Sequence, residues 1–589
     1  MNENRTFVES MCARAAEHGD RVAVVFSPDP FRAGADLTLT YGELDRDARA
    51  IAALLQDRFA PGSRILVLHP TGLDFTRSFI GCLYAGMVPV AAPLPDGYRR
   101  QTDRLAAIAR DADAAAALAD AADEDALAAW ADEQDLGAVA RIVPAREDLP
   151  APDAWTPPPP DPGALAFLQY TSGSVADPKG VMVDHANVLA NTEILAGIAE
   201  LDAESVLGGW LPMYHDFGLI GQLLTPLGLG GRSVLMAPMA FLRRPVSWLK
   251  FVERHGVDFS PAPNFAFDLC VQRVTDEELA GLDLSGWRSA VNGAEPVHAA
   301  TVEAFTRRFA AAGLRPSAML PGYGMAETTL VVSGDRPRRF PVLTEVDTAA
   351  FERGELRPPE PGAPVRRLVS SGPAEFLDVR IVDPRTCRAL PDGRVGEIWV
   401  RGANVARGYW RRPEETARVF DAALAGAADG AGGFLRTGDL GVLRAGELYV
   451  TGRIKELIIH RGRNLYPQDL EATARTAHPA LARGAGAAFA VEVPAEELVV
   501  VQECRGRVPQ GLAEVAARIR DSLNREHGIV PKGVVLVRPG GVDRTTSGKI
   551  QRGVVRGRFL AGDLPVLHAE LAPDVVALRA ERPGGAAAS

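Results

Sequence analysis

The segment ALAFLQYTSGSVADPKG, residues 164–180, decides how the rest of the chain is interpreted. Its first seven residues are mostly apolar and predict a buried strand that runs straight into a polar loop. Glycine lets backbone N–H groups approach an anion, hydroxyl groups add donors, and a lysine adds positive charge. We therefore expect a phosphate-binding loop after the strand. Its expected phosphate ligands are Thr171, Ser172, Gly173, Ser174 and Lys179.

The loop alone would also be compatible with an ordinary turn. It is not a Walker A motif, because Lys179 is followed by Gly180 rather than by Ser or Thr. Five later motifs make the stronger case, since six such motifs in this order are not expected by chance. They are NGAE at 292–295, YGMAET at 323–328, RTGD at 436–439, TGRIK at 451–455 and TSGKIQR at 546–552.

Length, charge and cysteine content exclude several classes of protein. The chain has 589 residues, too many for one compact core, so we expect two or more domains. Its 64 Lys and Arg against 75 Asp and Glu give a net charge of −11, which argues against a basic surface for nucleic acids or anionic membranes. The sequence contains no long apolar run and no CxxC pair. These features predict a cytoplasmic protein that binds no nucleic acid, has no transmembrane segment and holds no structural zinc.

Strand-like and helix-like segments alternate along most of the chain, which is typical of an α/β fold with largely parallel sheets. Thr40 and Glu43 form a capping box that predicts the start of a helix. Residues 105–140 are rich in Ala, Asp and Glu, and we expect a solvated helical excursion there. The composition changes near residues 451–459, where we place a hinge. An amphipathic helix is expected after it, at residues 512–526.

In order and spacing, the motifs resemble those of the adenylate-forming superfamily, which includes acyl-CoA synthetases, adenylation domains and luciferases. The resemblance covers about residues 20–560. Further segments are similar to one branch, the fatty acyl-AMP ligases. These segments are WLPMYHDFGLI at 210–220, FLRRP at 241–245, PNFAFD at 263–268, YGMAETTL at 323–330 and RGRNLYPQ at 461–468.

The resemblance implies an α/β fold with two unequal domains. The large N-terminal domain, residues 1–452, would hold largely parallel sheets between helices and a small distorted β-barrel-like part. A small mobile α+β domain at residues 453–562 would carry the catalytic lysine. Residues 563–589 would form a tail with a disordered end. Lys455 is expected at the hinge about which the small domain rotates.

The resemblance also implies the reaction. A fatty acid would react with ATP, in the presence of Mg²⁺, to give fatty acyl-AMP and pyrophosphate. The acyl group would then pass to the phosphopantetheine thiol of a separate acyl carrier protein, or of a carrier domain in a polyketide or nonribosomal peptide synthase. A carboxylic acid with a pKa of roughly 4 to 5 is already ionised at pH 7, so no general base is required. Catalysis would therefore consist mainly of positioning and of stabilising negative charge on phosphoryl oxygens.

By resemblance, three side chains carry the central roles. Lys549 would contact the α-phosphate and the carboxylate, Glu327 would bind Mg²⁺, and His215 would lie where the carboxylate meets the adenylate. A purely structural role for His215 stays open. Asp439 would accept hydrogen bonds from the ribose hydroxyls, with Arg453 beside it. The other nucleotide-binding residues are expected to be Asn292, Gly293, Ala294, Glu295, Tyr323, Gly324, Met325 and Ala326.

Residues 335–371 have little regular pattern and form a longer connection than usual. In fatty acyl-AMP ligases an extra segment in this region is thought to obstruct the path of coenzyme A; a tolerated surface insertion is the alternative. Three other functions stay open. The chain could be an acyl-CoA synthetase, an amino-acid adenylating enzyme that binds an ammonium group at Asp216, or a non-catalytic nucleotide-binding scaffold.

Overall fold

The computed structural model describes residues 5–32, 34–94, 99–144, 148–170, 178–426, 432–460, 463–493, 496–506, 511–545 and 548–580. Four residues of the predicted phosphate loop, Thr171, Ser172, Gly173 and Ser174, lie outside these ranges. The predicted disordered end of the chain, after residue 580, lies outside them as well.

The largest sheet of the large domain has eight strands in the order β14-β13-β12-β11-β9-β10-β1-β2. Its strands are β1 (Val22–Ser27), β2 (Leu37–Thr40), β9 (Val206–Gly209), β10 (Arg232–Met236), β11 (Phe259–Pro263), β12 (Ser289–Gly293), β13 (Met319–Gly324) and β14 (Val331–Gly334). The inner pairings are parallel, whereas the edge strands β2 and β14 pair antiparallel. The carboxyl ends of the parallel strands therefore meet at one edge, which is where such sheets bind ligands.

A second, parallel sheet of the large domain has the order β4-β3-β5-β6. Its strands are β3 (Arg64–Val67), β4 (Val88–Ala91), β5 (Ala114–Leu118) and β6 (Ala140–Ile142). Beside it, β7 (Leu165–Tyr170) and β8 (Gly180–Asp184) form the antiparallel pair that encloses the predicted phosphate loop. The class predicted from the sequence, α/β with largely parallel sheets, is confirmed.

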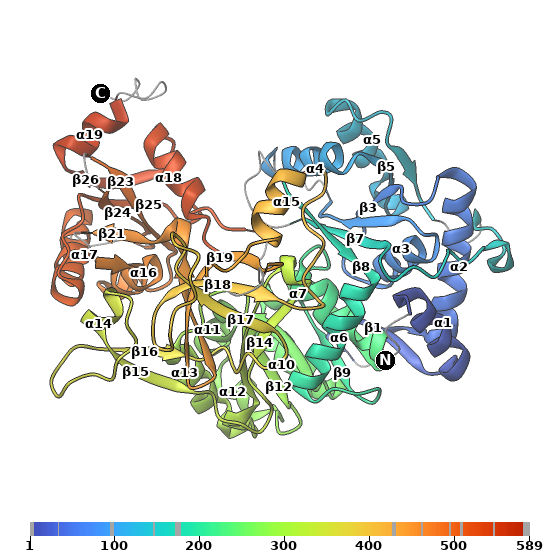
Figure 1. Ribbon diagram of the computed structural model, residues 1–589, viewed down its shortest axis with the longest axis horizontal. Helices are drawn as coiled ribbons and strands as arrows, with labels where there is room; N and C mark the ends of the chain where they lie inside the picture. The colour runs from blue at the N-terminus through green and yellow to red at the C-terminus, as the bar shows by residue number, and fades with distance from the viewer. Residues whose placement is uncertain are drawn as a thin grey trace.

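Helices cover these sheets (Figure 1). The longer ones are α1 (Phe7–His18), α2 (Tyr41–Arg58), α3 (Leu73–Tyr84), α4 (Arg99–Ala112), α5 (Glu124–Glu133), α6 (His185–Ala199), α10 (Val246–His255), α11 (Asn264–Arg273) and α13 (Ala299–Phe309). The predicted capping box starts α2: Thr40 accepts a hydrogen bond from the Glu43 N–H, and the Glu43 carboxylate accepts one from the Thr40 N–H. The apolar stripe of α2 faces the core, because Leu44, Ile51 and Leu55 are fully buried.

The prediction of a solvated helical excursion at residues 105–140 is wrong. The segment contains the end of α4, the helix α5 and two strands, and β5 pairs in parallel with both β3 and β6. Leu105 and Ile108 of α4 are buried, as is Leu118 of β5. The alanine run of β5 has low intrinsic strand propensity, and its position inside a sheet overrides that preference.

The large domain also contains a four-stranded antiparallel sheet. It consists of β17 (Asp378–Val382), β18 (Gly396–Arg401), β19 (Leu435–Arg444) and β20 (Glu447–Arg453). The insertion at residues 335–371 has more regular structure than its sequence indicated. It contains the antiparallel strands β15 (Leu343–Asp347) and β16 (Val365–Val369), with α14 (Thr348–Glu352) between them.

The small domain follows β20 and lies at the opposite end of the molecule from α1 and α2 (Figure 1). Its elements are β21 (Ile458–His460), β22 (Arg463–Leu465), α16 (Pro467–Thr476), β23 (Gly486–Glu492), β24 (Glu496–Glu503), α17 (Leu512–His527), β25 (Gly533–Val537), α18 (Arg552–Ala561), β26 (Val566–Leu571) and α19 (Pro573–Ala580). The sheet order is β23-β24-β25-β26, and α17 matches the amphipathic helix expected at 512–526. The boundary between residues 452 and 453 stays a prediction.

The expectation that the small domain ends at residue 562 needs correction. β26 pairs with β25 along its length, and Val575 of α19 is fully buried in the same apolar cluster as Val535 and Phe559. Residues 566–580 are therefore part of the folded small domain rather than a tail. The pairing of this segment with a distant strand is not visible in its own sequence.

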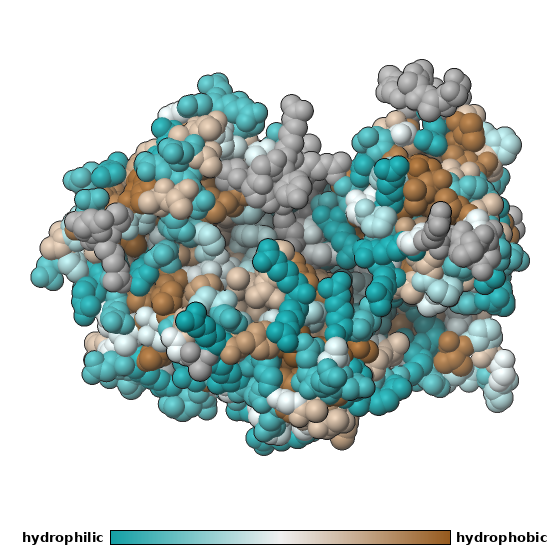
Figure 2. All heavy atoms as spheres, turned by 180° about the vertical axis from the view of Figure 1, so that it is seen from behind, coloured by the Kyte–Doolittle hydropathy of each residue, from teal (hydrophilic) through white to brown (hydrophobic). Residues whose placement is uncertain are grey.

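On the face seen from behind, the hydrophobic residues among those that the structure describes are scattered between hydrophilic ones (Figure 2). Large aromatic side chains such as Trp248, Trp287 and Phe305 lie inside the large domain and pack edge to face. Within the described ranges, no helix is long and apolar enough to cross a membrane.

Two neighbouring valines of α19 test whether this helix is an integral part of the small domain. Val575 is fully buried, whereas Val576 is half exposed. Val575→Asp should lower the free energy of unfolding of the small domain by about 3–5 kcal/mol, because it leaves an uncompensated charge in an apolar cluster. Val576→Asp is the matched control and should change it by less than about 0.5 kcal/mol. Urea titration followed by circular dichroism measures both; equal effects would contradict the burial of α19.

Candidate active site

A cavity of about 950 Å³ lies between the carboxyl edge of the eight-stranded sheet and the small domain. The ends of β12 and β13 form part of its wall, and loops of the small domain close it from the other side. It brings together most of the residues singled out from the sequence. Those that line it are His215, Gly293, Ala294, Glu295, Tyr323, Gly324, Met325, Ala326, Glu327, Asp439, Arg453 and Lys549.

Three predicted residues in the described ranges do not line this cavity. Asn292 is fully buried behind its wall, where its amide Nδ2 donates a hydrogen bond to Asn264 Oδ1 at 3.2 Å. Lys455 lies in a single 3₁₀ turn, Ile454–Glu456, directly after β20. Lys179 lies directly before β8 and forms an ion pair with Glu415, as described below.

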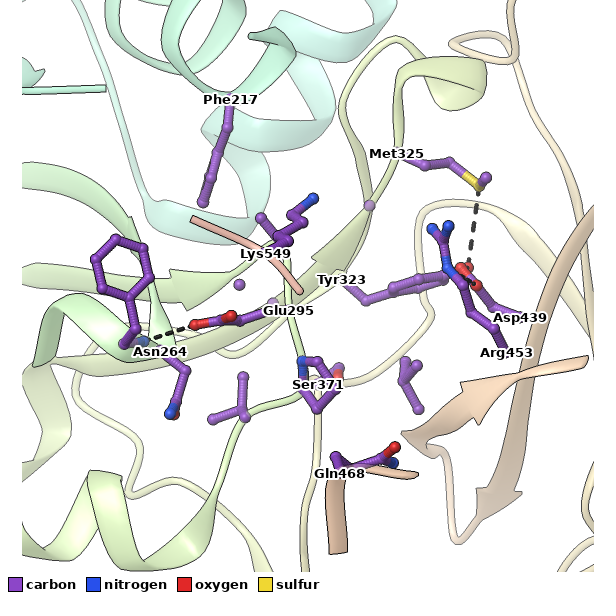
Figure 3. A pocket seen from close by; sticks show the side chains of 18 of the residues that line it. Phe217, Asn264, Glu295, Tyr323, Met325, Ser371, Asp439, Arg453, Gln468 and Lys549 are labelled. Carbon is purple, nitrogen blue, oxygen red and sulfur yellow. Dashed lines mark hydrogen bonds and ion pairs between the residues drawn. The ribbon is translucent and has the colours of Figure 1, made fainter. Parts of the chain in front are cut away.

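The end of β12 lies close to the neighbouring strand β13. A side chain at Gly293 would place its Cβ 2.9 Å from the carbonyl oxygen of Gly322 in the neighbouring strand, so glycine allows the two strands to lie this close. Ala294 takes a left-handed conformation with φ of 64°. This turn directs Glu295 back towards α11, where Oε1 accepts the Phe265 N–H at 2.6 Å (Figure 3). Burial raises the pKa of Glu295, and the Phe265 N–H and the cationic Lys549 oppose that shift.

Asp439 is held between a phenol and a guanidinium. The Tyr323 hydroxyl donates to Asp439 Oδ2 at 2.8 Å, and Arg453 Nε lies 3.0 Å from Asp439 Oδ1 (Figure 3). Asp439 and Arg453 are directly paired across β19 and β20, so their geometry is set by the strand register. A carboxylate has about four acceptor positions, and each oxygen therefore keeps one for an incoming hydroxyl group.

Lys549 enters the cavity from the small domain (Figure 3). Its backbone is fixed by Thr545, which accepts the Lys549 N–H through Oγ1 at 3.0 Å and donates its own N–H to the Lys549 carbonyl at 2.8 Å. Gly548 has φ of 88°, and a Cβ there would lie 2.7 Å from the ring of Phe265 in the large domain. The loop can therefore pass this close to Phe265 only with glycine before the lysine.

The charge of Lys549 is balanced by acidic groups of the large domain. Burial lowers the pKa of Lys549, and the carboxylates of Asp216 and Glu295 oppose this shift. Burial would raise the pKa of Asp216, but His215 and Lys549 outweigh it and hold this pKa below its ordinary range. Asp216 Oδ1 lies 2.5 Å from His215 Nδ1, so His215 and Asp216 act as one paired unit beside the lysine.

Glu327 follows β13 in a single 3₁₀ turn, and Oε1 accepts the Tyr409 hydroxyl at 2.9 Å. Burial raises the pKa of Glu327, and the hydrogen bond from Tyr409 opposes that shift. No group of three or more His, Cys, Asp or Glu side chains within the described ranges could hold a metal ion. A single carboxylate facing the cavity fits Mg²⁺ that is bound mainly by substrate phosphates, as this ion prefers.

Lys179 forms an ion pair with Glu415, with 2.5 Å between Nζ and Oε1, and its ammonium lies 5.5 Å from the centre of the Tyr409 ring. Tyr409 therefore connects the predicted phosphate lysine to the predicted magnesium ligand. Nothing in the sequence indicated Tyr409 or Glu415, since Tyr409 lies 82 positions after its partner Glu327.

A second group of side chains has the hydrogen-bonding order of a Ser-His-Asp triad. His69 Nδ1 lies 2.6 Å from Asp120 Oδ1, and Ser78 Oγ lies 2.8 Å from His69 Nε2. Ser78 is fully buried and lines no part of the cavity described above. A nucleophile needs access to its substrate, so we assign this group a structural role that ties α3 to the ends of β3 and β5.

Comparison with protein families identifies the class to which this fold and cavity belong. Residues 12–410 match the model described as "AMP-binding enzyme", which covers more than half of the chain. Residues 455–569 match the model "Disco-interacting protein 2-like, AMP domain". The chain therefore belongs to the AMP-binding enzyme family, whose adenylating members use ATP.

Individual relatives narrow the class further. The chain is 42% identical to the medium-chain-fatty-acid–[acyl-carrier-protein] ligase JamA of Moorena producens, over 90% of each chain. It is 40% identical to the long-chain-fatty-acid–AMP ligase FadD26 of Mycobacterium marinum, over 89% of this chain and 91% of that one. The solved fatty acyl-adenylate ligase of L. pneumophila, in complex with acyl adenylate and pyrophosphate, matches with a TM-score of 0.73 and 35% identity, over 96% and 98% of the two chains. Within the family, the enzyme is thus an adenylate-forming fatty-acid ligase.

The charges around Lys549 predict how the rate of pyrophosphate release depends on pH. A lysine that stabilises a phosphoryl oxygen must be protonated, so pyrophosphate release should fall as the pH rises through the lowered pKa of Lys549. Asp216→Asn removes an anion that favours the ammonium form, and should therefore move the alkaline limb of the profile to lower pH. The exposed Asp276 provides the control, since Asp276→Asn should leave the profile unchanged. The measurement is kcat/KM for pyrophosphate release from about pH 7 to pH 10; a shift of the Asp216→Asn limb to higher pH would refute this assignment.

Proposed function

We propose that the enzyme activates a fatty acid as acyl-AMP with release of pyrophosphate, and then transfers the acyl group to the phosphopantetheine thiol of a separate acyl carrier protein or carrier domain. The observation that carries the proposal is the convergence of Lys549, Glu327 and Asp439 on one cavity between the two domains. The relatives whose names specify fatty-acid ligation support the substrate class.

In this proposal Asp439 accepts hydrogen bonds from the ribose hydroxyls, while Tyr323 and the wall at Gly293 hold adenine. Lys549 donates to the α-phosphate and to the incoming carboxylate, so it lowers the repulsion between two anions as they approach. A carboxylate oxygen forms a bond to the α-phosphorus, the bond to the bridging oxygen breaks, and its electron pair leaves on pyrophosphate. No proton is transferred in this step, which agrees with the lack of any need for a general base.

Glu327 would hold Mg²⁺, with Tyr409 fixing the carboxylate through its hydroxyl hydrogen bond. The ion would neutralise charge on the phosphates when bound. Asn292, Lys179 and Lys455 do not line the cavity, so their proposed roles are less direct. Asn292 would act from behind the cavity wall through Asn264, Lys179 would first have to leave Glu415, and Lys455 stays the proposed hinge.

The insertion supports a carrier protein, rather than coenzyme A, as the acceptor. Its contacts with the small domain include Arg366 with Asp469 at 2.5 Å, Glu352 with Arg463 at 2.8 Å, and the rings of Phe351 and Tyr466 with centroids 5.2 Å apart. A segment held to the small domain in this way would obstruct the path of coenzyme A to the cavity. The enzyme can recognise the protein surface around a carrier-bound thiol, and free coenzyme A has no such surface.

The acceptor is tested by supplying the purified enzyme with ATP, Mg²⁺ and fatty acids of several chain lengths, and then with a holo-acyl carrier protein or with coenzyme A. We expect pyrophosphate release with fatty acids and acyl transfer to the carrier. Rapid formation of acyl-CoA would defeat the choice of acceptor. Exchange of pyrophosphate with amino acids instead of fatty acids would defeat the choice of substrate.

Lys549→Ala separates the two half-reactions. Adenylation should slow by about 10²–10³-fold, the effect of removing one charge-stabilising donor. Transfer from supplied acyl-AMP to the carrier should persist, because that step forms no bond to phosphorus. Lys532 of the small domain, which pairs with Asp574, provides the control, and Lys532→Ala should leave both steps unchanged. Unchanged pyrophosphate release by Lys549→Ala would revive the alternative of a non-catalytic scaffold.

The role of Glu327 is tested by magnesium titration. Glu327→Gln should raise the Mg²⁺ concentration needed for half-maximal adenylation by at least about tenfold, because a carboxylate ligand is lost. Tyr409→Phe keeps the carboxylate and removes only its 2.9 Å hydrogen bond, so a smaller rise is expected. Steady-state rates at fixed ATP over a range of Mg²⁺ report both effects. An unaltered Mg²⁺ requirement in Glu327→Gln would exclude it as the ligand.

A further inference from the structure

One cationic residue that the sequence motifs did not reveal reaches the cavity from the N-terminal part of the large domain. This residue is Arg104, in α4. It lines the cavity together with Gln169, Tyr170 and Tyr214. Among the described residues that line the cavity, it is the only Lys or Arg that precedes Arg366 in the chain. The other cationic side chains there come from the insertion, from β20 or from the small domain.

A hydrogen bond between α4 and β7 helps to fix the position of Arg104. Arg104 and Asp111 are seven residues apart, which places them on the same face of the helix, two turns apart. The Tyr170 hydroxyl donates to Asp111 Oδ2 at 2.6 Å, so this face of α4 lies along the end of β7. Tyr170 is the last residue before the predicted phosphate loop, and Arg104 therefore lies on the helix face that contacts the end of β7.

The opposite side of this end of the cavity is also fixed. Gln169 Nε2 donates to the Tyr214 carbonyl oxygen at 2.9 Å, which holds the segment leading to His215 against β7. Arg104 thus shares one wall with His215 and Asp216, the pair that faces Lys549. A nucleotide whose α-phosphate meets Lys549 would reach Arg104 if its remaining phosphates extend along this wall.

Lys179, the lysine that the loop motif predicts as a phosphate ligand, is less well placed than Arg104 to bind a phosphate in the cavity. Lys179 is paired with Glu415 and does not line the cavity. A guanidinium has five N–H donors in a planar fork that matches two phosphate oxygens at once, whereas an ammonium acts as a point charge. Burial lowers the pKa of Arg104, and Tyr214 opposes this shift; an arginine nevertheless stays protonated in proteins.

We propose that Arg104 binds the β- and γ-phosphates of ATP and the pyrophosphate that is released. The inference rests on the proposed adenylation function and adds a ligand contact to it. In the adenylation step the electron pair of the broken P–O bond stays on pyrophosphate, so negative charge grows on the oxygens that Arg104 contacts. The guanidinium donates hydrogen bonds to these oxygens and transfers no proton. Because Arg104 belongs to the large domain, it keeps this contact whatever the small domain does.

The test compares Arg104→Ala and Arg104→Lys with Arg110→Ala in ATP–pyrophosphate exchange. Arg110 is an exposed arginine on the same helix that bonds the Gln134 carbonyl, and it provides the matched control. Arg104→Ala should raise the KM for pyrophosphate by about tenfold to a hundredfold, the scale of a lost hydrogen bond to a charged group. Arg104→Lys should raise the KM for pyrophosphate less than Arg104→Ala does, and Arg110→Ala should have the KM of the wild type.

A second arm distinguishes phosphate binding from a structural role and from binding of the carrier. Transfer from supplied acyl-AMP to a holo-carrier protein should be unchanged in Arg104→Ala, since pyrophosphate takes no part in it. An unchanged KM for pyrophosphate would overturn the proposal, and so would an equal loss in both arms. If a thermal denaturation assay shows that Arg104→Ala does not fold, the same two measurements are made on Arg104→Lys and are interpreted in the same way. Failure of the wild type to exchange pyrophosphate with any fatty acid would instead count against the proposed function, whatever Arg104 does.

Discussion

The organisation of the site depends on one constraint, the burial of a single ammonium group between two domains. A buried charge is costly unless opposite charges accompany it, and Lys549 has the carboxylates of Asp216 and Glu295 as its nearby anions. Both carboxylates belong to the large domain, while the lysine belongs to the small one. The charge balance therefore favours the arrangement in which the domains meet, and the close contact of Gly548 with Phe265 requires it. Most other features of the site place groups around this ammonium.

The sequence predicted the parts of this arrangement that are encoded locally. Strand and helix periodicity predicted the parallel sheets, and the capping box at Thr40 predicted the start of α2. Short motifs at Tyr323, Asp439 and Lys549 indicated residues that the fold does bring to one cavity. Such motifs can be recognised in the sequence, because a loop that approaches a phosphate or a purine needs particular residue types within a few positions of one another.

Features that arise from contacts between distant segments were missed or misread. The alanine run at β5 has the composition of a solvated helix, and only its pairing with β3 and β6 makes it a strand. Residues 566–571 are an edge strand because β25 lies beside them. Tyr409, Glu415 and Arg104 stand in no recognisable motif, and each acquires its place from a partner on another element. Local sequence carries no record of such pairings, so these residues of the site could be found only in the structure.

The division of charge between the domains has a consequence for the order of the two half-reactions. If Arg104 and Glu327 hold the phosphate end of the nucleotide from the large domain, Lys549 is needed only while the bond to the α-phosphorus forms. Once pyrophosphate leaves, the negative charge that favoured the ammonium group in the cavity decreases, and the desolvation cost of Lys549 is less well offset. Withdrawal of the lysine loop then becomes less unfavourable after adenylation than before it. Loss of the product that the large domain holds would in this way bias the small domain towards the movement that admits a thiol.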